Sequence, residues 1–293
     1  EYNPDARCPM FDKYLNRVVP DADCRKVLAE YLGYIFINNL KLEKALILYG
    51  SGANGKSVFF EIVNAILGDE NICSYSLQNL TKYDSYQRAE LSNKLLNYAS
   101  EINGKLEASI FKQLVSGEPV EARQIYGKPF VMRDYGKLMF NCNELPKEVE
   151  QTNAFFRRFI IIPFNQTIPE SEQDPELAKK IIASELSGVF NWLLDGLRRV
   201  LAQRKFTQSE MVQDQVDAYR RESDSVAMFI EEEGYSPAID DFVFLKALYG
   251  DYKTFCCDNG YKTCSIRTFS ERIKMIGFLT ERKTPGNVVY AKK

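Results

Sequence analysis

The stretch GSGANGKS, residues 50–57, constrains this chain more than any other segment. It fits the pattern G-x-x-x-x-G-K-[ST], in which glycines let backbone N–H groups turn inward around a phosphate. The short apolar run KALILYG precedes it, and SVFFEIVNAILG follows with apolar residues at helical spacing. This order of strand, loop and helix places an anion at a helix N-terminus, where partial positive charge favours it. A glycine-rich turn with a solvated lysine would explain neither the strand nor the helix.

The residue types in the loop indicate how a nucleotide would be held. Lys56 supplies a point charge for the β- and γ-phosphates, and Ser57 offers an oxygen to Mg²⁺. The chain contains no NKxD segment of the kind that reads guanine. The sequence therefore predicts ATP and Mg²⁺ as cofactors, with nucleotide contacts from Gly50, Ser51, Gly52, Ala53, Asn54, Gly55, Lys56, Ser57 and Val58.

Polar side chains follow two further predicted strands. Glu101 ends the strand KLLNYASE, where a carboxylate beside the loop can polarise an attacking water. Ser100 stands where an aspartate often holds Mg²⁺, and its hydroxyl can still bind a metal-bound water. The strand KLMFNCN ends in Asn141 and Asn143, and we expect Asn143 to read the γ-phosphate. Asparagine before proline is also common turn chemistry, which is the alternative for Asn143.

An arginine pair, Arg157 and Arg158, comes directly before the apolar strand FIIIPF. An arginine at this point can reach the γ-phosphate of a neighbouring subunit and stabilise charge in the transition state. Such a finger is worth ~10³–10⁵ in rate where it is used. We expect Arg158 to take this role, with Arg157 as the alternate, and a surface ion pair as the other interpretation.

Taken in order, the segments GSGANGKS, LLNYASE, FKQLVSGEPVEARQIYGKPF, KLMFNCNELP and FFRRFIIIPF resemble those of superfamily 3 helicases of the AAA+ class. The resemblance is to the phage, plasmid and poxvirus primase-helicase branch, and it covers roughly residues 25–165. It implies an α/β fold with a P-loop AAA+ core and flanking helical segments. It also implies a ring, expected to be a hexamer, with ATP hydrolysed between subunits.

The resemblance further implies a hairpin before the third strand that grips single-stranded DNA in the central channel. Its tip would lie at Tyr126-Gly127-Lys128, where the glycine permits the turn. Lys128 would contact phosphate, and Tyr126 would stack on a base or sugar. An ordinary two-stranded turn is the alternative.

Basic residues are concentrated near the C-terminus, although the net charge of the chain is −2. From Lys246 onward there are ten basic residues and four acidic ones, an asymmetry that favours contact with a polyanion. Residues 243–293 look like a winged helix, with two helices and a hairpin wing whose turn is Pro-Gly-Asn. We expect this domain to bind duplex DNA, with protein contacts as the alternative. The predicted DNA-binding residues are Arg267, Arg272 and Lys274 on the second helix and Arg282 and Lys283 on the wing.

Composition excludes several other classes of site. The chain has no histidine, which removes Ser-His and Cys-His catalysis, and its seven cysteines include no CxxC pair for zinc. No apolar run approaches the roughly 18 residues that span a bilayer. We expect no membrane association and a cytoplasmic location, in a bacterial host. The predicted parts are a helical segment (1–44), the ATPase core (45–166), a helical segment packing on the core (167–222) and the winged-helix domain (223–293).

Together these features predict an ATP-dependent DNA helicase that unwinds duplex DNA during replication of a phage, plasmid or other mobile element. A nucleotide-gated initiator that binds and melts an origin without processive translocation is the alternative. A P-loop small-molecule kinase is a third hypothesis, against which the arginine pair, the hairpin lysine and the basic C-terminal segment argue.

Overall fold

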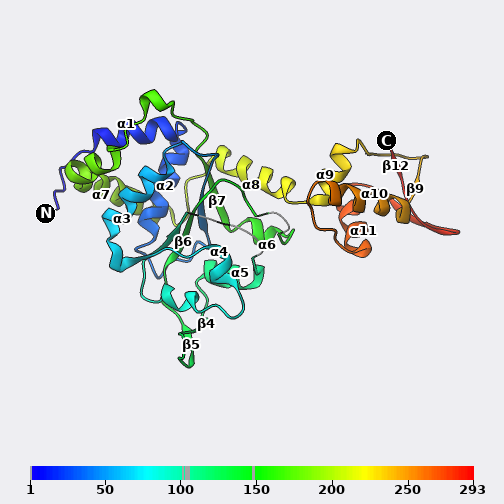
Figure 1. Cartoon of the computed structure of the whole chain (residues 1–293), viewed down its shortest axis with the longest axis horizontal. Helices are drawn as coiled ribbons and strands as arrows, with labels where there is room; N and C mark the ends of the chain where they lie inside the picture. The colour runs from blue at the N-terminus through cyan, green and yellow to red at the C-terminus, as the bar shows by residue number, and fades with distance from the viewer. Residues whose placement is uncertain (1, 101, 103–105, 147–148) are drawn as a thin grey trace. The chain divides into compact units, whose positions relative to one another are not determined.

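The computed structural model describes all residues except 1, 101, 103–105 and 147–148. It forms two compact units, each with its own core (Figure 1). The first unit contains the chain up to Pro146 together with Thr152–Asp217, and the second contains Ala218–Lys293 with the short segment before Thr152. The division into four parts stays a prediction.

The centre of the first unit is a parallel five-stranded sheet with the order β2-β3-β6-β1-β7. Its strands are almost continuously apolar and buried, as expected for a parallel sheet that helices cover on both faces. Their bounds are β1 Ala45–Tyr49, β2 Ile72–Cys73, β3 Leu96–Ala99, β6 Lys137–Cys142 and β7 Phe159–Pro163. The α/β fold class is therefore confirmed.

Helices of the first unit surround this sheet. The longest, α7, runs for 27 residues and packs along α2, and both lie in one core with α1, α3 and the strands. The helices are α1 Pro9–Val18, α2 Ala22–Tyr34, α3 Lys56–Leu67, α4 Leu77–Thr81, α5 Ala108–Ser116, α6 Asn153–Phe156 and α7 Leu177–Gln203. Three short 3-10 turns lie at Asp69–Asn71, Gln87–Leu91 and Glu170–Glu172.

A two-stranded antiparallel hairpin extends from the first unit. Its strands are β4 Val120–Arg123 and β5 Pro129–Met132, and Arg123 is paired with Pro129 at the end of the ladder. Figure 1 shows the hairpin pointing away from the central sheet. The predicted tip, Tyr126-Gly127-Lys128, lies in the loop between the two strands.

The second unit consists of helices and short antiparallel strands. Helix α8 (Glu210–Glu222) leads into it, followed by α9 Ser225–Glu232, α10 Leu245–Asp258 and α11 Ile266–Met275. The strands β9 Val243–Phe244, β10 Thr280–Lys283 and β11 Gly286–Val289 form one sheet, and β8 Ser236–Pro237 pairs with β12 Ala291–Lys292. Phe229, Tyr252 and Phe269 pack at the centre of its core.

The turn of the C-terminal hairpin differs from the prediction. Lys283 pairs with Gly286, which leaves Thr284 and Pro285 as the turn. The expected turn Pro-Gly-Asn was wrong, because Gly286 and Asn287 already belong to β11.

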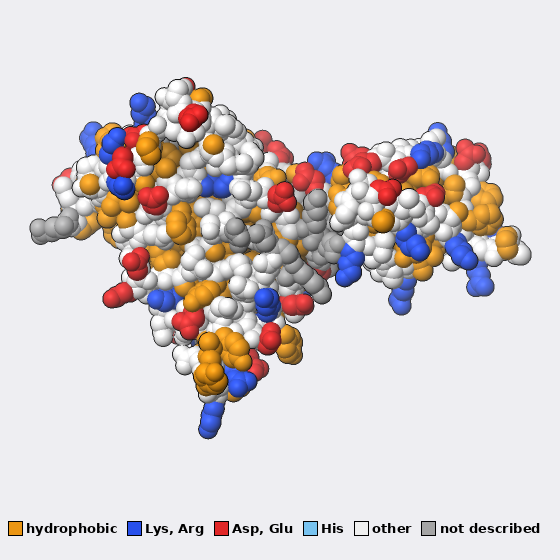
Figure 2. Space-filling view, in the orientation of Figure 1, with side chains coloured by type: hydrophobic (Ala, Val, Ile, Leu, Met, Phe, Trp, Pro, Cys, Tyr) orange, Lys and Arg blue, Asp and Glu red, His pale blue; other side chains and the backbone are white. Residues whose placement is uncertain are grey.

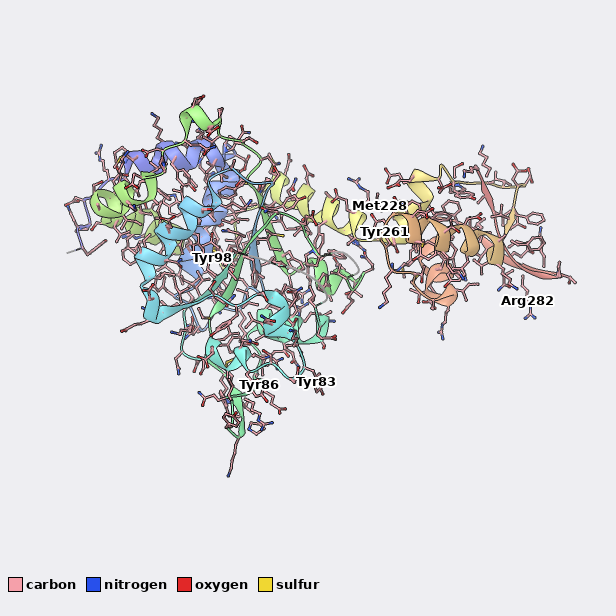
Figure 3. All side chains as sticks on the ribbon, viewed as in Figure 1. Tyr83, Tyr86, Tyr98, Met228, Tyr261 and Arg282 are labelled. Atoms are coloured by element: carbon pink, nitrogen blue, oxygen red, sulfur yellow. The ribbon has the colours of Figure 1, made fainter. Side chains whose placement is uncertain are left out.

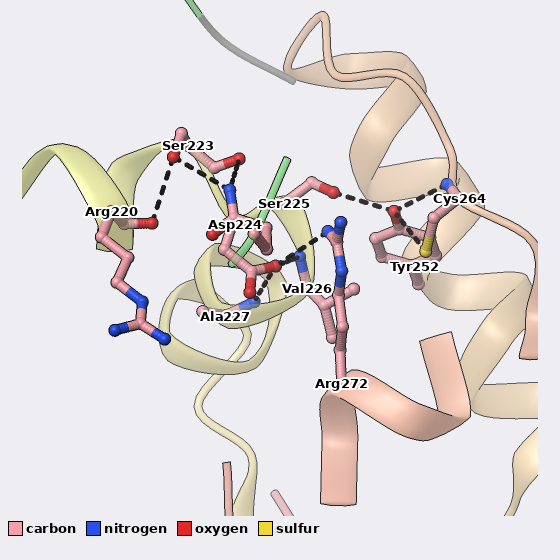
Figure 4. A network of polar contacts seen from close by, with 10 residues as sticks. Arg220, Ser223, Asp224, Ser225, Val226, Ala227, Tyr252, Cys264 and Arg272 are labelled. Carbon is pink, nitrogen blue, oxygen red and sulfur yellow. Dashed lines mark hydrogen bonds and ion pairs between the residues drawn. The ribbon is translucent and has the colours of Figure 1, made fainter. Parts of the chain in front are cut away.

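Polar contacts join the three helices of the second unit (Figure 4). The carboxylate of Asp224 caps α9 by accepting from the backbone N–H of Val226 at 3.0 Å, and it also accepts from Arg272 at 3.2 Å. The hydroxyl of Ser225 lies 2.9 Å from that of Tyr252, which accepts from the N–H of Cys264. Arg272 therefore ties α11 to the start of α9.

Close packing of α2 against α7 depends on a glycine. A Cβ placed on Gly196 would overlap the backbone carbonyl of Ala29, which cannot move without displacing α2. The neighbouring Glu30 is fully buried, and its carboxylate accepts from Arg199 and Thr207. The two helices thus approach at backbone distance around one satisfied buried charge.

Gly196→Ala should destabilise the first unit by about 1–3 kcal/mol, because overpacking forces the helices apart. Urea unfolding followed by the fluorescence of Trp192, the only tryptophan, measures this on α7 itself. Gly250→Ala is the matched control, since that helical glycine has open space around it and lies in the second unit. An unchanged midpoint for Gly196→Ala would contradict the packing.

Candidate nucleotide-binding site

The loop between β1 and α3 has a shape that only glycine-rich sequence adopts easily. Gly52 and Gly55 have φ of 106° and 87°, in the region that favours glycine, and a Cβ on Gly50 would overlap the carbonyl of Phe164. The amide of Asn54 donates to that same carbonyl at 2.8 Å. The loop is therefore anchored to the residue that follows β7.

Lys56 and Asn143 are brought together by this fold. Lys56 is the first residue of α3 and is only 7% exposed, and its ammonium donates to the amide oxygen of Asn143 at 3.1 Å and to the carbonyl of Gly50. Burial lowers the pKa of Lys56. Both acceptors are neutral, so the buried cation lacks a counter-charge among these partners and would gain from an anion.

Asn141 has a different role from Asn143. Its side chain is buried and accepts from the hydroxyl of Tyr98 at 2.8 Å, an interaction between β6 and β3 inside the sheet. Tyr98 is labelled within the first unit in Figure 3. Asn143, just beyond the end of β6, is the amide that faces Lys56.

A cavity of about 920 Å³ opens over the loop. Its first wall contains Gly52 to Val58 together with Ser100 and Asn143, so Ser57 and Ser100 line the same space. Glu101 lies outside the described residues, and its role stays a prediction. Among the residues that the structure describes, no cluster of Cys, Asp or Glu side chains is placed to hold a metal ion unaided. The hydroxyls of Ser57 and Ser100 fit Mg²⁺ that arrives with nucleotide phosphates.

The second wall of this cavity was missed by sequence reasoning. It comes from α1, through Met10, Tyr14 and Arg17, and from a segment after β7 that includes Ile168 and Glu172. Tyr14 donates to the carbonyl of Gly55 at 2.7 Å, and Arg17 pairs with Glu172. No local pattern signals these contacts, because α1 reads only as an amphipathic helix far from the loop in sequence.

The arginine pair is divided by burial. Arg158 is 8% exposed and donates to Ser116 at 2.9 Å and to the carbonyl of Ala154. Arg157 is exposed and pairs with Glu43 at 2.7 Å. Only the guanidinium of Arg157 therefore lies on the surface of the single chain, and the choice of Arg158 as the finger stays a prediction.

The tip of the β4–β5 hairpin is open to solvent. Tyr126 is fully exposed with φ of 60°, Gly127 donates to the carbonyl of Gln124 at 2.9 Å, and Lys128 is exposed. Exposed apolar side chains that the sequence did not single out accompany them, namely Ile125, Phe130 and Val131. Figure 2 shows this mixture of apolar and basic side chains at the end of the hairpin.

Two tyrosines beside the hairpin were also missed. Tyr83 is 91% exposed and Tyr86 is partly exposed, and Figure 3 labels both near the hairpin. With Arg123 and Pro129 they line a pocket of about 440 Å³. Aromatic side chains and an arginine around an open pocket suit stacking of nucleic-acid bases.

The basic residues predicted in the second unit fall into two groups. Lys274 and Arg282 are exposed, and Arg267 is exposed with only a local partner, Glu271 (Arg282 is labelled in Figure 3). Arg272 is held by Asp224, and Lys283 lies over the ring of Phe242 at 4.3 Å from its centroid. The first group is available to a ligand without breaking contacts within the core of the unit.

No helix among the described residues combines the length and the apolar character needed to cross a bilayer.

Comparison with known proteins gives two family matches. Residues 48–158 match a model described as a family of unknown function (DUF5906), and residues 221–292 match one described as Poxvirus D5 protein-like. The putative helicase L207/L206 of Acanthamoeba polyphaga mimivirus is 26% identical over 175 residues, which are 57% of this chain and 18% of that protein. The resemblance to superfamily 3 helicases of the primase-helicase branch is confirmed.

A second curated relative extends the similarity. The putative helicase 121R of Invertebrate iridescent virus 3 is 24% identical over 254 residues, 75% of this chain and 27% of that protein. The chain therefore spans less than a third of the length of these two relatives.

Solved structures share the fold. An apo structure of the NrS-1 C terminal region has a TM-score of 0.56 and 14% identity, over 98% of this chain and 76% of that chain. A second apo structure of that region (305-718) gives a TM-score of 0.54 and 15% identity, over 98% and 77%. These likenesses confirm a mixed α/β architecture with a central parallel sheet.

Arg272→Gln should lower the stability of the second unit by about 1–2 kcal/mol, because Asp224 loses its charged donor. Arg267→Gln, the matched control on the same helix, should leave stability unchanged. Urea unfolding followed by far-UV circular dichroism reads both units, while Trp192 fluorescence reads only the first. An equal loss of stability in both variants would contradict the conclusion that Arg272, but not Arg267, stabilises the second unit.

Proposed function

We propose that this chain is the motor portion of an ATP-dependent DNA helicase that acts in replication of a mobile element. The observation that carries the proposal is the buried ammonium of Lys56, held by two neutral oxygens at the carboxyl edge of the parallel sheet. A buried cation without a counter-charge at the start of a helix is suited to phosphate. The helicase names of the viral relatives support this assignment.

Each residue of the site has a defined task under this proposal. The backbone from Gly50 to Val58 would hold the phosphates, Lys56 would bind the β- and γ-phosphates, and Ser57 and Ser100 would face Mg²⁺. Asn143 would bind the attacking water or the γ-phosphate, because its amide already lies beside Lys56. Hydrolysis of ATP supplies the free energy. Glu101 remains the predicted base.

The first unit would be a P-loop AAA+ core, and its assembly a ring, expected to be a hexamer. The strand order with β1 between β6 and β7 and the phosphate-type loop after β1 support the core assignment. Exposed Arg157 supports hydrolysis at a subunit interface. The hairpin, with Lys128 and Tyr126, would grip single-stranded DNA.

The second unit would be a winged-helix domain that binds duplex DNA. The order helix, strand, helix, helix, hairpin and the three-stranded sheet β10-β11-β9 support this assignment. The contacts would come from Arg267 and Lys274 on α11 and from Arg282 on the hairpin, while Arg272 and Lys283 would hold the domain together.

A strand-displacement assay on forked duplexes with 3′ or 5′ tails tests the function. The wild-type chain should separate strands only with ATP and Mg²⁺, and Lys56→Ala should lose both hydrolysis and unwinding by at least about 100-fold. Lys179→Gln, an exposed lysine on α7, is the control. ATP-dependent binding or melting without strand displacement would favour the origin-melting initiator, and full hydrolysis by Lys56→Ala would remove the site assignment.

Mixing experiments test the finger. Arg157→Ala subunits should hydrolyse little ATP alone but recover part of the activity when mixed with Lys56→Ala subunits, because each supplies what the other lacks at hybrid interfaces. Arg158→Ala serves as the comparison, and it should instead lower stability, because Ser116 and Ala154 no longer receive its hydrogen bonds. If Arg158→Ala subunits recover activity on mixing with Lys56→Ala and Arg157→Ala subunits do not, Arg158 is the finger. If neither variant recovers activity in confirmed mixed assemblies, no finger acts between subunits.

A further inference from the structure

A separate pocket of about 220 Å³ lies at the opposite edge of the sheet from the nucleotide site. Lys137, which lines it, begins β6, whereas Asn143 follows the last residue of that strand. At 3.3 Å per residue the two ends are roughly 20 Å apart. The pocket is therefore no extension of the cavity around Lys56.

Three cations line this pocket: Lys41, Arg133 and Lys137. Among the described residues none of the three forms an ion pair. Lys41 donates to the carbonyl of Gly117 at 2.8 Å, and the ammonium of Lys137 lies 4.7 Å from the centre of the Tyr34 ring. The carbonyl of Gly117 and the ring of Tyr34 are neutral, so neither compensates the positive charge of the pocket.

The cations also repel one another. Burial lowers the pKa of Lys137, and the nearby charge of Lys41 lowers it further. Among the described residues that line the pocket, Asp134 is the one carboxylate, and Glu118 lies near Tyr135. A bound anion would offset the repulsion and raise the pKa of Lys137.

Positive charge extends from the pocket along the same edge of the sheet. The strands β6, β1 and β7 lie side by side, and Lys137, Lys44 and Arg158 stand at or just before their first residues. Ser116, which lines the pocket, accepts from Arg158 at 2.9 Å. Three adjacent parallel strands thus begin with cations. The carboxylate of Glu43 lies beside them and pairs with both Arg157 and Arg158.

The position of the pocket indicates which anion it meets. Pro119 and Arg133, which line it, flank the hairpin strands β4 and β5 directly, and the tip of the hairpin carries Lys128. Strands of four residues are roughly 13 Å long, a span of about four nucleotides at about 3.4 Å each. One polynucleotide strand can therefore reach from the tip of the hairpin to its base.

We propose that the pocket formed by Lys41, Arg133 and Lys137 binds a phosphate group, supplied by the backbone of the nucleic-acid strand that the hairpin holds. This inference rests on the proposed function for the identity of that nucleic-acid strand. The site itself, a cationic pocket at the base of a projecting hairpin, is defined by the geometry alone.

The test uses the full chain with Lys41 and Arg133 both changed to glutamine, since both side chains are exposed and the core is left intact. The matched control removes the same charge from α7, as Lys179→Gln with Arg198→Gln, two exposed residues with only local partners. Lys128→Ala is the reference for the hairpin tip. Binding of fluorescent dT30 is measured by anisotropy over a series of salt concentrations.

Removing cations that neutralise phosphates should weaken binding and reduce the salt slope by roughly 0.7 for each phosphate that is no longer neutralised. The pocket variant and Lys128→Ala should each show this reduction, and the α7 control should not. A second arm titrates inorganic phosphate and follows thermal unfolding without DNA. Saturable stabilisation of wild type but not of the pocket variant, with an unchanged DNA slope, would identify free phosphate as the ligand.

The remaining outcomes test the pocket and the proposed function separately. If the pocket variant has the salt slope of wild type and phosphate does not raise the unfolding temperature of wild type, the pocket does not bind phosphate. No binding of dT30 by wild type would count against the proposed function, and the phosphate arm would still decide whether the pocket holds an anion. An unchanged slope for Lys128→Ala with a reduced slope for the pocket variant would support the pocket and move the DNA grip from tip to base.

Discussion

Parallel pairing of β1 with both β6 and β7 is the constraint on which the rest of the structure depends. Because the three strands run in one direction, everything at their carboxyl ends meets at one edge and everything at their amino ends at the other. The first edge gathers Lys56 and Asn143, and the second gathers Lys137 and the arginine pair. Both edges are cationic, but they differ in what surrounds the charge.

At the carboxyl edge the charge is enclosed. Lys56 is buried, held by neutral acceptors, and faces a cavity whose walls come from α1, from the loop and from the segment after β7. At the amino edge the three cations that line the pocket beside the hairpin, Lys41, Arg133 and Lys137, are exposed or partly exposed. An enclosed cation favours a small ligand that fills the cavity, whereas an open row of cations favours an extended one.

The sequence was sufficient for the parts of the site that are local. The run KALILYG, the loop and the following helix are contiguous, so their order alone predicts β1, the loop and α3 and places Lys56. Asn143 was predictable because it follows an apolar strand, and parallel strands end at one edge. Tyr14 was not, because its contact with Gly55 depends on how α1 packs after the whole first unit has formed.

Burial explains the other differences. Arg157 and Arg158 are identical in type and adjacent, and nothing local says which of them turns inward; packing against α5 buries Arg158. In the second unit, the sequence predicted that Arg267, Arg272 and Lys274 on one helix contact DNA. Because α11 lies against the start of α9, Arg272 instead pairs with Asp224. Composition fixes how many cations a helix has, and tertiary packing decides which remain available.

The arginine pair and the hairpin belong to one hydrogen-bonded assembly built on α5. Arg158 donates to Ser116, the last residue of that helix. The hydroxyl of Tyr135, which follows the hairpin, donates to the carbonyl of Glu118 at 2.7 Å and to that of Gln113 at 3.3 Å. Because α5 contacts both Arg158 and Tyr135, a displacement of Arg158 must be absorbed by α5 or carried to the base of the hairpin. The sheet itself, buried on both faces, is the part least able to yield.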